Sequence, residues 1–365
     1  MKNIDISIII THYNQNQYLK NCINSILKQK DITYQLIIID DCSDNFDRTK
    51  IENYIKDNKK ENLKSIIIID NKENIGTTKS LNKTLKNIEG DYSVFVAADD
   101  ELNKDNCLIE NINYLKNHNF DILITQQNMM DNNLKNLYYK YVEPQFIKII
   151  ESRNNEAIFN LLSKGCFFPA GATLYKSSYI KKSQFDEECR LIEDWTTYLR
   201  ACLLNTKIGY HNITTINHRD GGLSHSAETT KSHEEFIQDI YTIYCKYLIP
   251  NMKHMSFSNR IWVTRSFKYY KDRFGTSKLK INKEYSFTRY ILIVWYTLIR
   301  IKNYVDSRTF LNVTLLLLIL DYNLNSNFIH AIFKIYTSIC SIFMIFNIIY
   351  KYFEKNKKNK ESQRR

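Results

Sequence analysis

Glycine and proline are scarce in this chain, which has 8 and 3 of them among 365 residues. A collagen-like repeat and a flexible glycine-rich linker are therefore excluded. The 8 cysteines include no C-x-x-C pair and no zinc spacing with nearby histidines, so we expect reduced thiols in a cytosolic compartment. The opening sequence MKNIDISIIITHY has no apolar leader with a cleavage site, so no secretory signal is expected. The composition, 44% hydrophobic and 25% charged residues, is that of a globular protein, and the length suits two modest domains.

Positive charge is concentrated in the last third of the chain. Residues 251–302 hold 12 Lys or Arg and 2 Asp or Glu, residues 303–350 are balanced, and residues 351–365 hold 7 and 2. Because the whole chain carries +12, the last 115 residues carry +15 and residues 1–250 carry −3. The basic character therefore belongs to one region and is not a property of the whole protein.

Three apolar stretches lie among these basic residues, at 290–299, 309–320 and 335–350. The first two are too short to cross a bilayer, which takes about 20 apolar residues. The third has 16 residues without a formal charge, which is borderline. We expect peripheral binding to the anionic cytoplasmic face of the cell membrane. A transmembrane helix, or a helical bundle that completes the fold and ends in a solvated basic tail, are the alternatives.

The first 125 residues alternate between strand-like and helix-like patterns. Short apolar runs rich in Ile or Val occur at Ile6–Ile10, Leu36–Ile39, Ile66–Ile69, Val94–Ala97 and Ile122–Ile124. Such runs suit buried parallel strands. Between them, apolar residues recur at helical spacing, as in Leu19, Cys22, Ile23, Ile26 and Leu27. This alternation predicts an α/β fold with an open, mostly parallel sheet flanked by helices, and ligands of such sheets bind beyond the carboxyl ends of the strands.

Two pairs of carboxylates follow strands of this predicted sheet. Asp40 and Asp41 follow the second strand, and Asp99 and Asp100 follow the fourth. Like charges in one crevice repel, so the arrangement needs a compensating cation or hydrogen-bond donors. A divalent cation with oxygen ligands, which also attracts phosphate, would supply that compensation. The alternative is that each Asp only forms a local turn or caps the next helix.

Six segments in order resemble glycosyltransferase family 2, whose members have the GT-A nucleotide-sugar-binding fold. They are SIIITHYNQNQYLKNCINSILKQ, LIIIDDCSDN, NIGTTKSLNKTL, GDYSVFVAADDEL, FDEECRLIEDWTTYLR and INHRDGGLSHS. The resemblance implies a catalytic domain over residues 1–227, and a mainly helical, basic region over residues 228–365 would follow it.

The resemblance assigns donor-binding roles to matching positions. Thr11 and Tyr13 match the contacts to the nucleobase and ribose, and Asp41, with Asp40 beside it, matches the acceptor of the uracil hydrogen bond. Gly76 lies in the matching helix start. Lys79 could replace a basic residue that many members carry where this chain has Leu81, although a solvated helix lysine explains it as well. These positions imply UDP as the nucleotide, and dTDP shares the same ring edge.

Asp99 and Asp100 match the end of the family's DXD motif, which binds ribose, sugar and metal. The chain departs from the motif because its first acidic position is Ala97. The resemblance implies a Mn²⁺ or Mg²⁺ ion held by Asp100, with Asp99 and His218 as further ligands. Arg219 is the expected diphosphate contact, with His218 and His225 as alternatives. The adjacent Gly221 and Gly222 suit either a closing hinge or an exposed polar loop.

Asp194 matches the family's general base, which takes the proton of the acceptor hydroxyl. An ordinary acidic first turn of a helix is the alternative explanation of Glu193-Asp194. Trp195 could stack on an acceptor sugar, but packing is the more common role at such a position. The resemblance implies a direct displacement that inverts the anomeric centre.

The expected function is transfer of a sugar from a nucleoside-diphosphate sugar to a hydroxyl of a glycan or polyprenyl-linked glycan, in the assembly of cell-surface polysaccharide. One alternative is a degenerate relative that binds a nucleotide-sugar without turnover, because of Ala97. A nucleic-acid binder that uses the basic region is another, but the chain has no recognised nucleic-acid motif. The sequence decides neither the sugar, nor the linkage, nor the oligomeric state.

Overall fold

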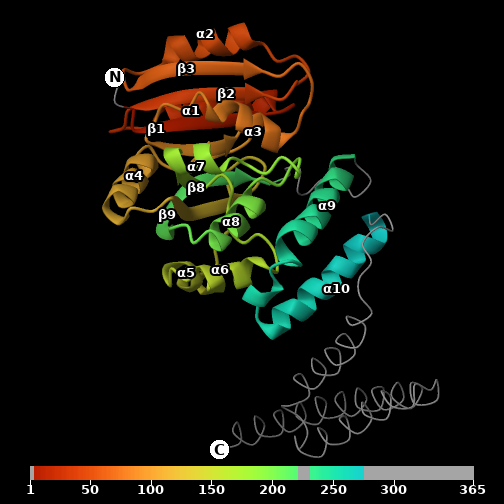
Figure 1. The fold of residues 1–365 in the computed structure, drawn as a ribbon. Coiled ribbons are helices and arrows are strands. Elements are labelled where there is room, and N and C mark those ends of the chain that lie inside the picture. The colour runs from red at the N-terminus through yellow and green to blue at the C-terminus, as the bar shows by residue number, and fades with distance from the viewer. Residues whose placement is uncertain (1–3, 221–230, 275–365) are drawn as a thin grey trace, which may run out of the picture. The chain divides into compact units, whose positions relative to one another are not determined.

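The computed structural model describes residues 4–220 and 231–274. Within them, one sheet of nine strands forms the centre (Figure 1). The strands are β1 (Ile6–His12), β2 (Tyr34–Asp40), β3 (Leu63–Asp70), β4 (Tyr92–Ala97), β5 (Glu101–Leu102), β6 (Ile122–Met130), β7 (Leu137–Lys140), β8 (Thr173–Lys176) and β9 (Ile208–Arg219). The helices are α1 (Asn16–Leu27), α2 (Arg48–Asn58), α3 (Thr77–Leu85), α4 (Cys107–His118), α5 (Pro144–Glu151), α6 (Asn155–Leu162), α7 (Ser177–Ser183), α8 (Asp194–Leu203), α9 (Lys231–Ile243) and α10 (Phe257–Phe274), with a π-helical turn η2 (Tyr244–Leu248) and a 3-10 turn η3 (Met252–His254).

The strand order is β3-β2-β1-β4-β8-β6-β9-β5, and β7 pairs with β6 outside this path. The pairs among β1, β2, β3 and β4 are parallel, and so is β6 with β9. β8 runs antiparallel to both β4 and β6. All five apolar runs of the sequence became strands, so the predicted open, mostly parallel α/β sheet is confirmed.

Side chains of each strand alternate between two cores, one on each face of the sheet. On β1, Ile6, Ile8 and Ile10 pack with α1, α2 and α4, while Ile9 packs on the opposite face. That opposite face holds α3, α5, α6, α7 and α8, together with side chains of α9, η2 and α10. Helices on both faces explain why these strands are apolar throughout and do not alternate with polar residues.

Local signals set several helix boundaries. Asp47 caps α2 by accepting a hydrogen bond from the Lys50 backbone N–H at 2.9 Å, and Asn154 caps α6 in the same way. Pro144 occupies the first turn of α5. Gly76 begins α3 with φ +90°, and a Cβ at this position would lie 2.9 Å from the Arg190 carbonyl oxygen. Only glycine fits this turn without strain, which keeps the start of α3 against the segment before α8.

The part of the chain after residue 230 is described only in part. Tyr244 and Phe267, from η2 and α10, are buried in the core that also contains α8. The predicted boundary between residues 227 and 228 falls in a segment outside the described residues, and so do the apolar stretches at 290–299, 309–320 and 335–350. In the described part, no helix combines the length and the apolarity needed to cross a bilayer.

Candidate active site

The polar residues predicted from the sequence meet at one edge of the sheet. Thr11 of β1 is in register with Ala97 of β4, and His12 of β1 is in register with Asp40 of β2. Asp40 ends β2 and Asp41 follows it, while Asp99 and Asp100 lie just beyond the end of β4. The carboxyl ends of parallel strands lie at the same edge of a sheet. Tyr13 follows β1 and is 42% exposed. The structure thus brings the predicted nucleobase and phosphate positions to one rim.

Asp40 is buried and paired with a histidine. Its carboxylate lies 2.6 Å from Nδ1 of His12 and accepts a hydrogen bond from the Ser43 backbone N–H at 2.9 Å. Burial opposes its ionisation, but these hydrogen bonds outweigh burial and lower the pKa of Asp40. Asp40 therefore holds the turn after β2, as the local alternative proposed. Its part in donor binding stays a prediction.

Asp41 is also buried, and protein donors surround it. Its carboxylate accepts hydrogen bonds from the backbone N–H groups of Ile75 and Gly76 at 2.9 and 2.8 Å, and from Asn71 and Ser80 at 2.9 and 3.0 Å. It thereby joins the end of β2 to the start of α3. Three of these contacts reach Oδ1 and one reaches Oδ2, so Oδ2 keeps room for a further donor. The uracil contact stays a prediction that this geometry permits.

The two lysines of α3, Lys79 and Lys83, lie in different environments. Lys79 is exposed, as the explanation by a solvated helix lysine expects. Lys83 instead donates to the Asn71 side chain at 2.9 Å, and Asn71 in turn donates to Asp41. The donor-binding role of Lys79 therefore stays a prediction, while Lys83 is the lysine of this helix that reaches the Asp41 network.

Asp99 and Asp100 are 7% and 3% exposed, and basic groups from the end of β9 surround them. Nδ1 of His218 lies 3.0 Å from Oδ2 of Asp100, and the Arg219 backbone N–H donates to Oδ1 of Asp100 at 3.1 Å. Burial and the neighbouring charge of Asp100 raise the pKa of Asp99 to about 6. Burial disfavours a charge on His218, but the charge of Asp100 outweighs it and raises the pKa of His218.

A divalent cation fits the chemistry of these residues. Across residues 4–220 and 231–274, no group of three His, Cys, Asp or Glu side chains is arranged as a complete metal site. Asp99 and Asp100 are nevertheless buried side by side, and burial together with the charge of Asp100 raises the pKa of Asp99. A cation between them would relieve this repulsion. Mg²⁺ and Mn²⁺ are commonly held by one or two carboxylates together with substrate phosphates and water. Asp99 and Asp100, with His218 next to them, match that requirement.

The Arg219 guanidinium is 5% exposed and has several acceptors. Nε donates to the Asp99 carbonyl oxygen at 2.9 Å, another nitrogen donates to the Asn132 carbonyl oxygen, and a third pairs with Glu101 at 3.3 Å. Arg219 therefore fixes the loop after β4 and the turn after β6. Its diphosphate contact stays a prediction, and His225, Gly221 and Gly222 lie outside the described residues.

Asp194 is the first residue of α8 and follows Glu193 in the chain. Helix α8 packs on the same face of the sheet as α3. One carboxylate oxygen of Asp194 accepts a hydrogen bond from the Trp195 backbone N–H at 2.6 Å, and the other lies 3.4 Å from the Cys166 sulfur. Burial raises the pKa of Asp194, and burial together with the charge of Asp194 raises the pKa of Glu193 to about 8. Glu193 is therefore protonated at neutral pH, and Asp194 is a stronger base than a solvated aspartate. Trp195 is buried and donates to the Leu162 carbonyl oxygen, so it has a packing role.

A short loop connects the candidate base with the candidate metal ligands. Cys166 contacts Asp194, and a Cβ on Gly171 would lie 3.7 Å from Oδ2 of Asp100. Five peptide units separate Cys166 from Gly171, which limits their Cα separation to about 19 Å. One loop therefore contacts Asp194 at one end and lies beside Asp100 at the other.

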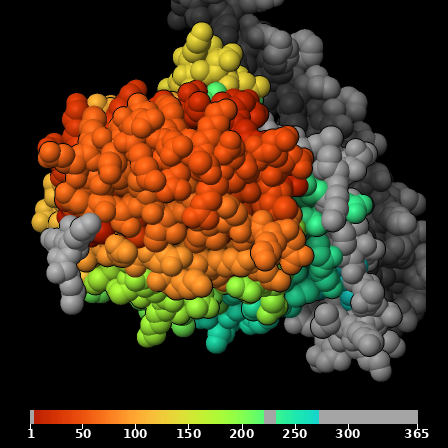
Figure 2. Space-filling model, turned by 90° about the horizontal axis from the view of Figure 1, so that it is seen from above, coloured from red at the N-terminus to blue at the C-terminus, as the bar shows by residue number. Residues whose placement is uncertain are grey.

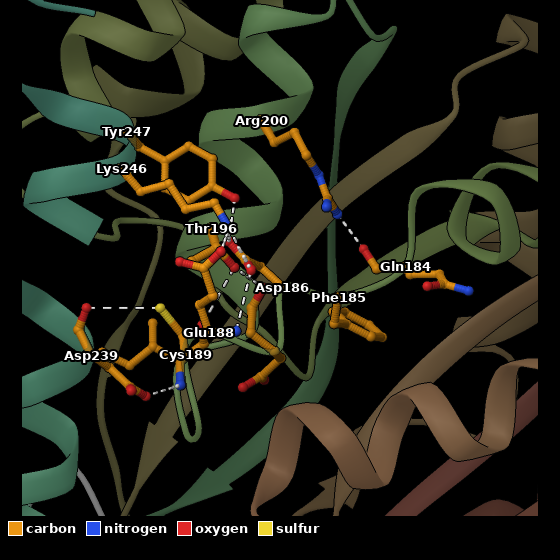
Figure 3. Close-up of polar contacts among 12 residues, drawn as sticks. Gln184, Phe185, Asp186, Glu188, Cys189, Thr196, Arg200, Asp239, Lys246 and Tyr247 are labelled. Carbon is orange, nitrogen blue, oxygen red and sulfur yellow. Dashed lines mark hydrogen bonds and ion pairs between the residues drawn. The ribbon is translucent and has the colours of Figure 1, made fainter. Parts of the chain in front are cut away.

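Sequence reasoning missed the residues that hold the segment before Asp194. The Asp239 carboxylate, on α9, accepts hydrogen bonds from three consecutive backbone N–H groups, those of residues 190, 191 and 192, at 2.9, 2.6 and 3.0 Å. Figure 3 shows Asp239 reaching this segment next to Cys189. The available signal was an acid on an apolar helical stripe, since Phe236 and Ile243 lie three residues before and four after Asp239.

A second cluster ties η2 to the same segment. Lys246 lies 2.8 Å from Asp186 and 2.7 Å from Glu188, and the Tyr247 hydroxyl donates to Asp186 at 2.5 Å (Figure 3). Burial opposes ionisation of Asp186, but the bonds from Lys246 and Tyr247 lower its pKa. Helical residues after 230 therefore hold the base-carrying segment at two points.

Arg190 links this segment to the nucleobase side. It pairs with Glu235 of α9 at 3.1 Å, and it donates to the Asn74 carbonyl oxygen at 3.0 Å. Its own carbonyl oxygen accepts a hydrogen bond from the Thr78 backbone N–H at 3.2 Å. Arg190 therefore connects the segment that leads to Asp194 with the turn whose two N–H groups bind Asp41.

We expect the Glu193→Gln variant to be more stable than the wild type at pH 8. The carboxyl of Glu193 titrates near 4.5 in an unfolded chain and near 8 in the fold. The folded chain binds more protons between these values, so the contribution of Glu193 to stability is greatest below pH 4.5 and is lost as the pH rises through 8. Thermal unfolding at pH 5 and pH 8 measures this, and we expect a gain of about 2–4 °C at pH 8 that is smaller at pH 5. An equal gain at both pH values would contradict the assigned titration.

Solved structures of similar fold place this architecture in a known class. Residues 1–349 of TarS from S. aureus, in complex with UDP-GlcNAc, match with a TM-score of 0.50 and 18% identity, covering 88% of this chain and 93% of that one. A mannosyltransferase from Pyrobaculum calidifontis, in complex with GDP-Man and Mn²⁺, matches with a TM-score of 0.51 and 10% identity, covering 88% of both chains. The fold is that of a GT-A type nucleotide-sugar transferase.

Residues 7–182 match the family described as Glycosyl transferase family 2, and this part of the chain belongs to that family. Poly(ribitol-phosphate) beta-N-acetylglucosaminyltransferase TarS from Staphylococcus aureus is 26% identical over 207 residues, 55% of this chain and 33% of the relative. This chain therefore matches only a third of that relative's length. Processive diacylglycerol beta-glycosyltransferase from Mycoplasma genitalium is 24% identical over 304 residues, 77% of this chain and 87% of the relative.

Proposed function

We propose that this protein is an inverting glycosyltransferase that moves a sugar from a UDP-sugar to a hydroxyl of a cell-surface glycan or a lipid-linked glycan. The observation that supports the proposal is the loop from Cys166 to Gly171, which contacts the Asp194 carboxylate at one end and lies beside the Asp100 carboxylate at the other. Transfer needs both a proton acceptor and a site for a leaving diphosphate, and these two carboxylates supply them.

In this mechanism the nucleobase lies near Thr11, Tyr13 and Asp41, at the ends of β1 and β2. Mn²⁺ or Mg²⁺ held by Asp99 and Asp100 would balance the charge of the leaving diphosphate. Asp194 accepts the proton of the attacking hydroxyl, aided by a pKa that burial has raised. Because one face of the sugar is attacked as the other loses the diphosphate, the anomeric configuration inverts.

The acceptor we favour is a polymer or lipid-linked glycan at the cytoplasmic face of the membrane. Two relatives support this choice, since one is a poly(ribitol-phosphate) transferase and another a diacylglycerol transferase. The +15 charge of the last 115 residues fits an anionic membrane surface at which such acceptors are held.

A panel of nucleotide-sugars, each with and without Mn²⁺, tests the proposal by thermal shift. We expect UDP-sugars to raise the unfolding temperature more than GDP-sugars, and Mn²⁺ to increase the shift. Radiolabel transfer from the best donor to poly(ribitol phosphate) and to diacylglycerol vesicles then tests turnover. Donor binding without a labelled product or donor hydrolysis would favour the non-catalytic relative that Ala97 suggests, and steeply salt-dependent binding of DNA would favour the nucleic-acid binder.

A further inference from the structure

Strand β7 exposes large apolar side chains at the edge of the domain. Leu137, Tyr138 and Tyr139 are 52%, 58% and 56% exposed, and β7 pairs only with β6 among the described strands. In Figure 2, the yellow segment that projects at the top belongs to the part of the chain that contains β7. Edge strands normally carry charges or are covered, so a row of exposed rings on one of them needs an explanation.

The sheet register places this strand close to the candidate metal ligands. Tyr139 is in register with Met129 of β6, and Met129 is in register with His218 of β9. Strands lie about 4.8 Å apart, so the Cα atoms of Tyr139 and His218 are about 10 Å apart. Residues in register project to the same face of a sheet, and the His218 side chain on that face contacts Asp100. Tyr139 therefore shares a sheet face with the Asp100–His218 pair.

Both ends of β7 are anchored to parts of the candidate site. In the turn between β6 and β7, the Asn132 carbonyl oxygen accepts a hydrogen bond from Arg219, which also donates to the Asp99 carbonyl oxygen. After β7, the Tyr141 hydroxyl donates to the Cys166 carbonyl oxygen at 3.3 Å, and the Cys166 sulfur contacts Asp194. The hairpin that contains β7 is thus connected to the Asp99–Asp100 end of the site through Asn132 and to the Asp194 end through Tyr141 and Cys166.

The same strand lies far from the candidate nucleobase position. β7 is bonded to β6, and two strands, β4 and β8, separate β6 from β1, which ends next to Tyr13. A donor nucleotide at the ends of β1 and β2 therefore leaves β7 uncovered.

We propose that Tyr139 forms the platform on which a sugar ring of the acceptor glycan rests. This inference rests on the proposed function and specifies the acceptor class of that site. A pyranose presents an apolar C–H face and a rim of hydroxyls. A tyrosine matches this pattern with a flat apolar ring and a polar hydroxyl at its tip. Tyr139 holds the acceptor ring so that a neighbouring hydroxyl reaches Asp194, and it takes no part in proton transfer.

The test compares Tyr139→Ala with wild type in the full chain, using methyl glucoside, methyl galactoside and methyl N-acetylglucosaminide as acceptor probes. We expect the KM for the acceptor to rise about threefold to tenfold, which is the effect of losing one aromatic contact, while the thermal shift given by the donor stays at the wild-type value. Tyr139→Phe keeps the ring and should retain the wild-type KM. Tyr269→Ala is the matched control, because Tyr269 is 61% exposed on α10.

Saturation-transfer NMR with the same methyl pyranosides gives a second readout that needs no turnover. We expect the C–H signals of the sugar to receive saturation from wild type and from Tyr269→Ala, but much less from Tyr139→Ala. An unchanged KM, equal saturation in wild type and Tyr139→Ala, or no saturation from wild type would each overturn the platform. A chain that binds pyranosides through Tyr139 but neither hydrolyses nor transfers a donor sugar would overturn the proposed function and leave the platform standing.

Discussion

Asp194→Asn is expected to lower transfer by about 10²–10⁴-fold, the range that a positioned general base contributes. The amide keeps the shape of the side chain and can still accept the hydrogen bond from the Trp195 backbone N–H, so α8 should begin as before. It cannot take a proton from the acceptor hydroxyl. Initial rates with labelled donor measure the loss, and the thermal shift given by the donor should remain.

Glu193→Gln separates the two acids of this pair. Burial and the charge of Asp194 raise the pKa of Glu193 to about 8, so Glu193 is protonated at neutral pH and the amide resembles it while Asp194 stays in place. We expect it to lose less than tenfold in rate. If Glu193→Gln were the inactive variant and Asp194→Asn the active one, Glu193 would be the base and our assignment would be wrong.

Asp100→Asn is expected to reduce transfer by about 10²–10³-fold, comparable to removing one preorganised group that stabilises developing charge. Asn can still accept the hydrogen bond from the Arg219 backbone N–H, but it removes a negative charge that would hold a divalent cation. The additional thermal shift that Mn²⁺ gives with UDP should disappear in the same variant.

Asp105→Asn is the matched control for this prediction. Asp105 lies in the loop after β5, five residues beyond Asp100, and its side chain is 46% exposed and pairs with Lys30 at 3.1 Å. An exposed pair of this kind contributes little, so rate and Mn²⁺ response should match wild type. An Mn²⁺ response that survives in Asp100→Asn would show that the ion binds elsewhere.

The sequence predicted the sheet because its strands are continuous Ile and Val runs, a pattern that solvent-facing segments cannot carry. The resemblance to glycosyltransferase family 2 assigned roles to Asp41, Asp100 and Asp194, and those roles stay predictions. The sequence could not predict that Asp41 would be surrounded by protein donors, since Asn71 and Ser80 reach it only after α3 packs against β2. Short strands such as β7 have no apolar run, and pairing with β6 defines them.

Contacts between segments far apart in the chain were the least predictable. Arg190 and Asp239 are separated by 49 residues, and only the packing of α9 brings them together. The sequence led us to expect a diphosphate contact from Arg219. It did not reveal that Arg219 donates to the carbonyl oxygens of Asp99 and Asn132. Such pairings depend on tertiary geometry, which a pattern of residue types along one segment does not encode.

The carboxylate of Asp239 limits how far this protein can be shortened. A fragment that ends near residue 227 would retain every predicted donor-binding side chain and the base itself. It would lose the acceptor of three consecutive backbone N–H groups, and each buried group left unpaired costs about 1–3 kcal/mol. Such a truncation should still recognise UDP weakly while its 190–192 segment loosens, so fragments for crystallisation or assay should extend through α10.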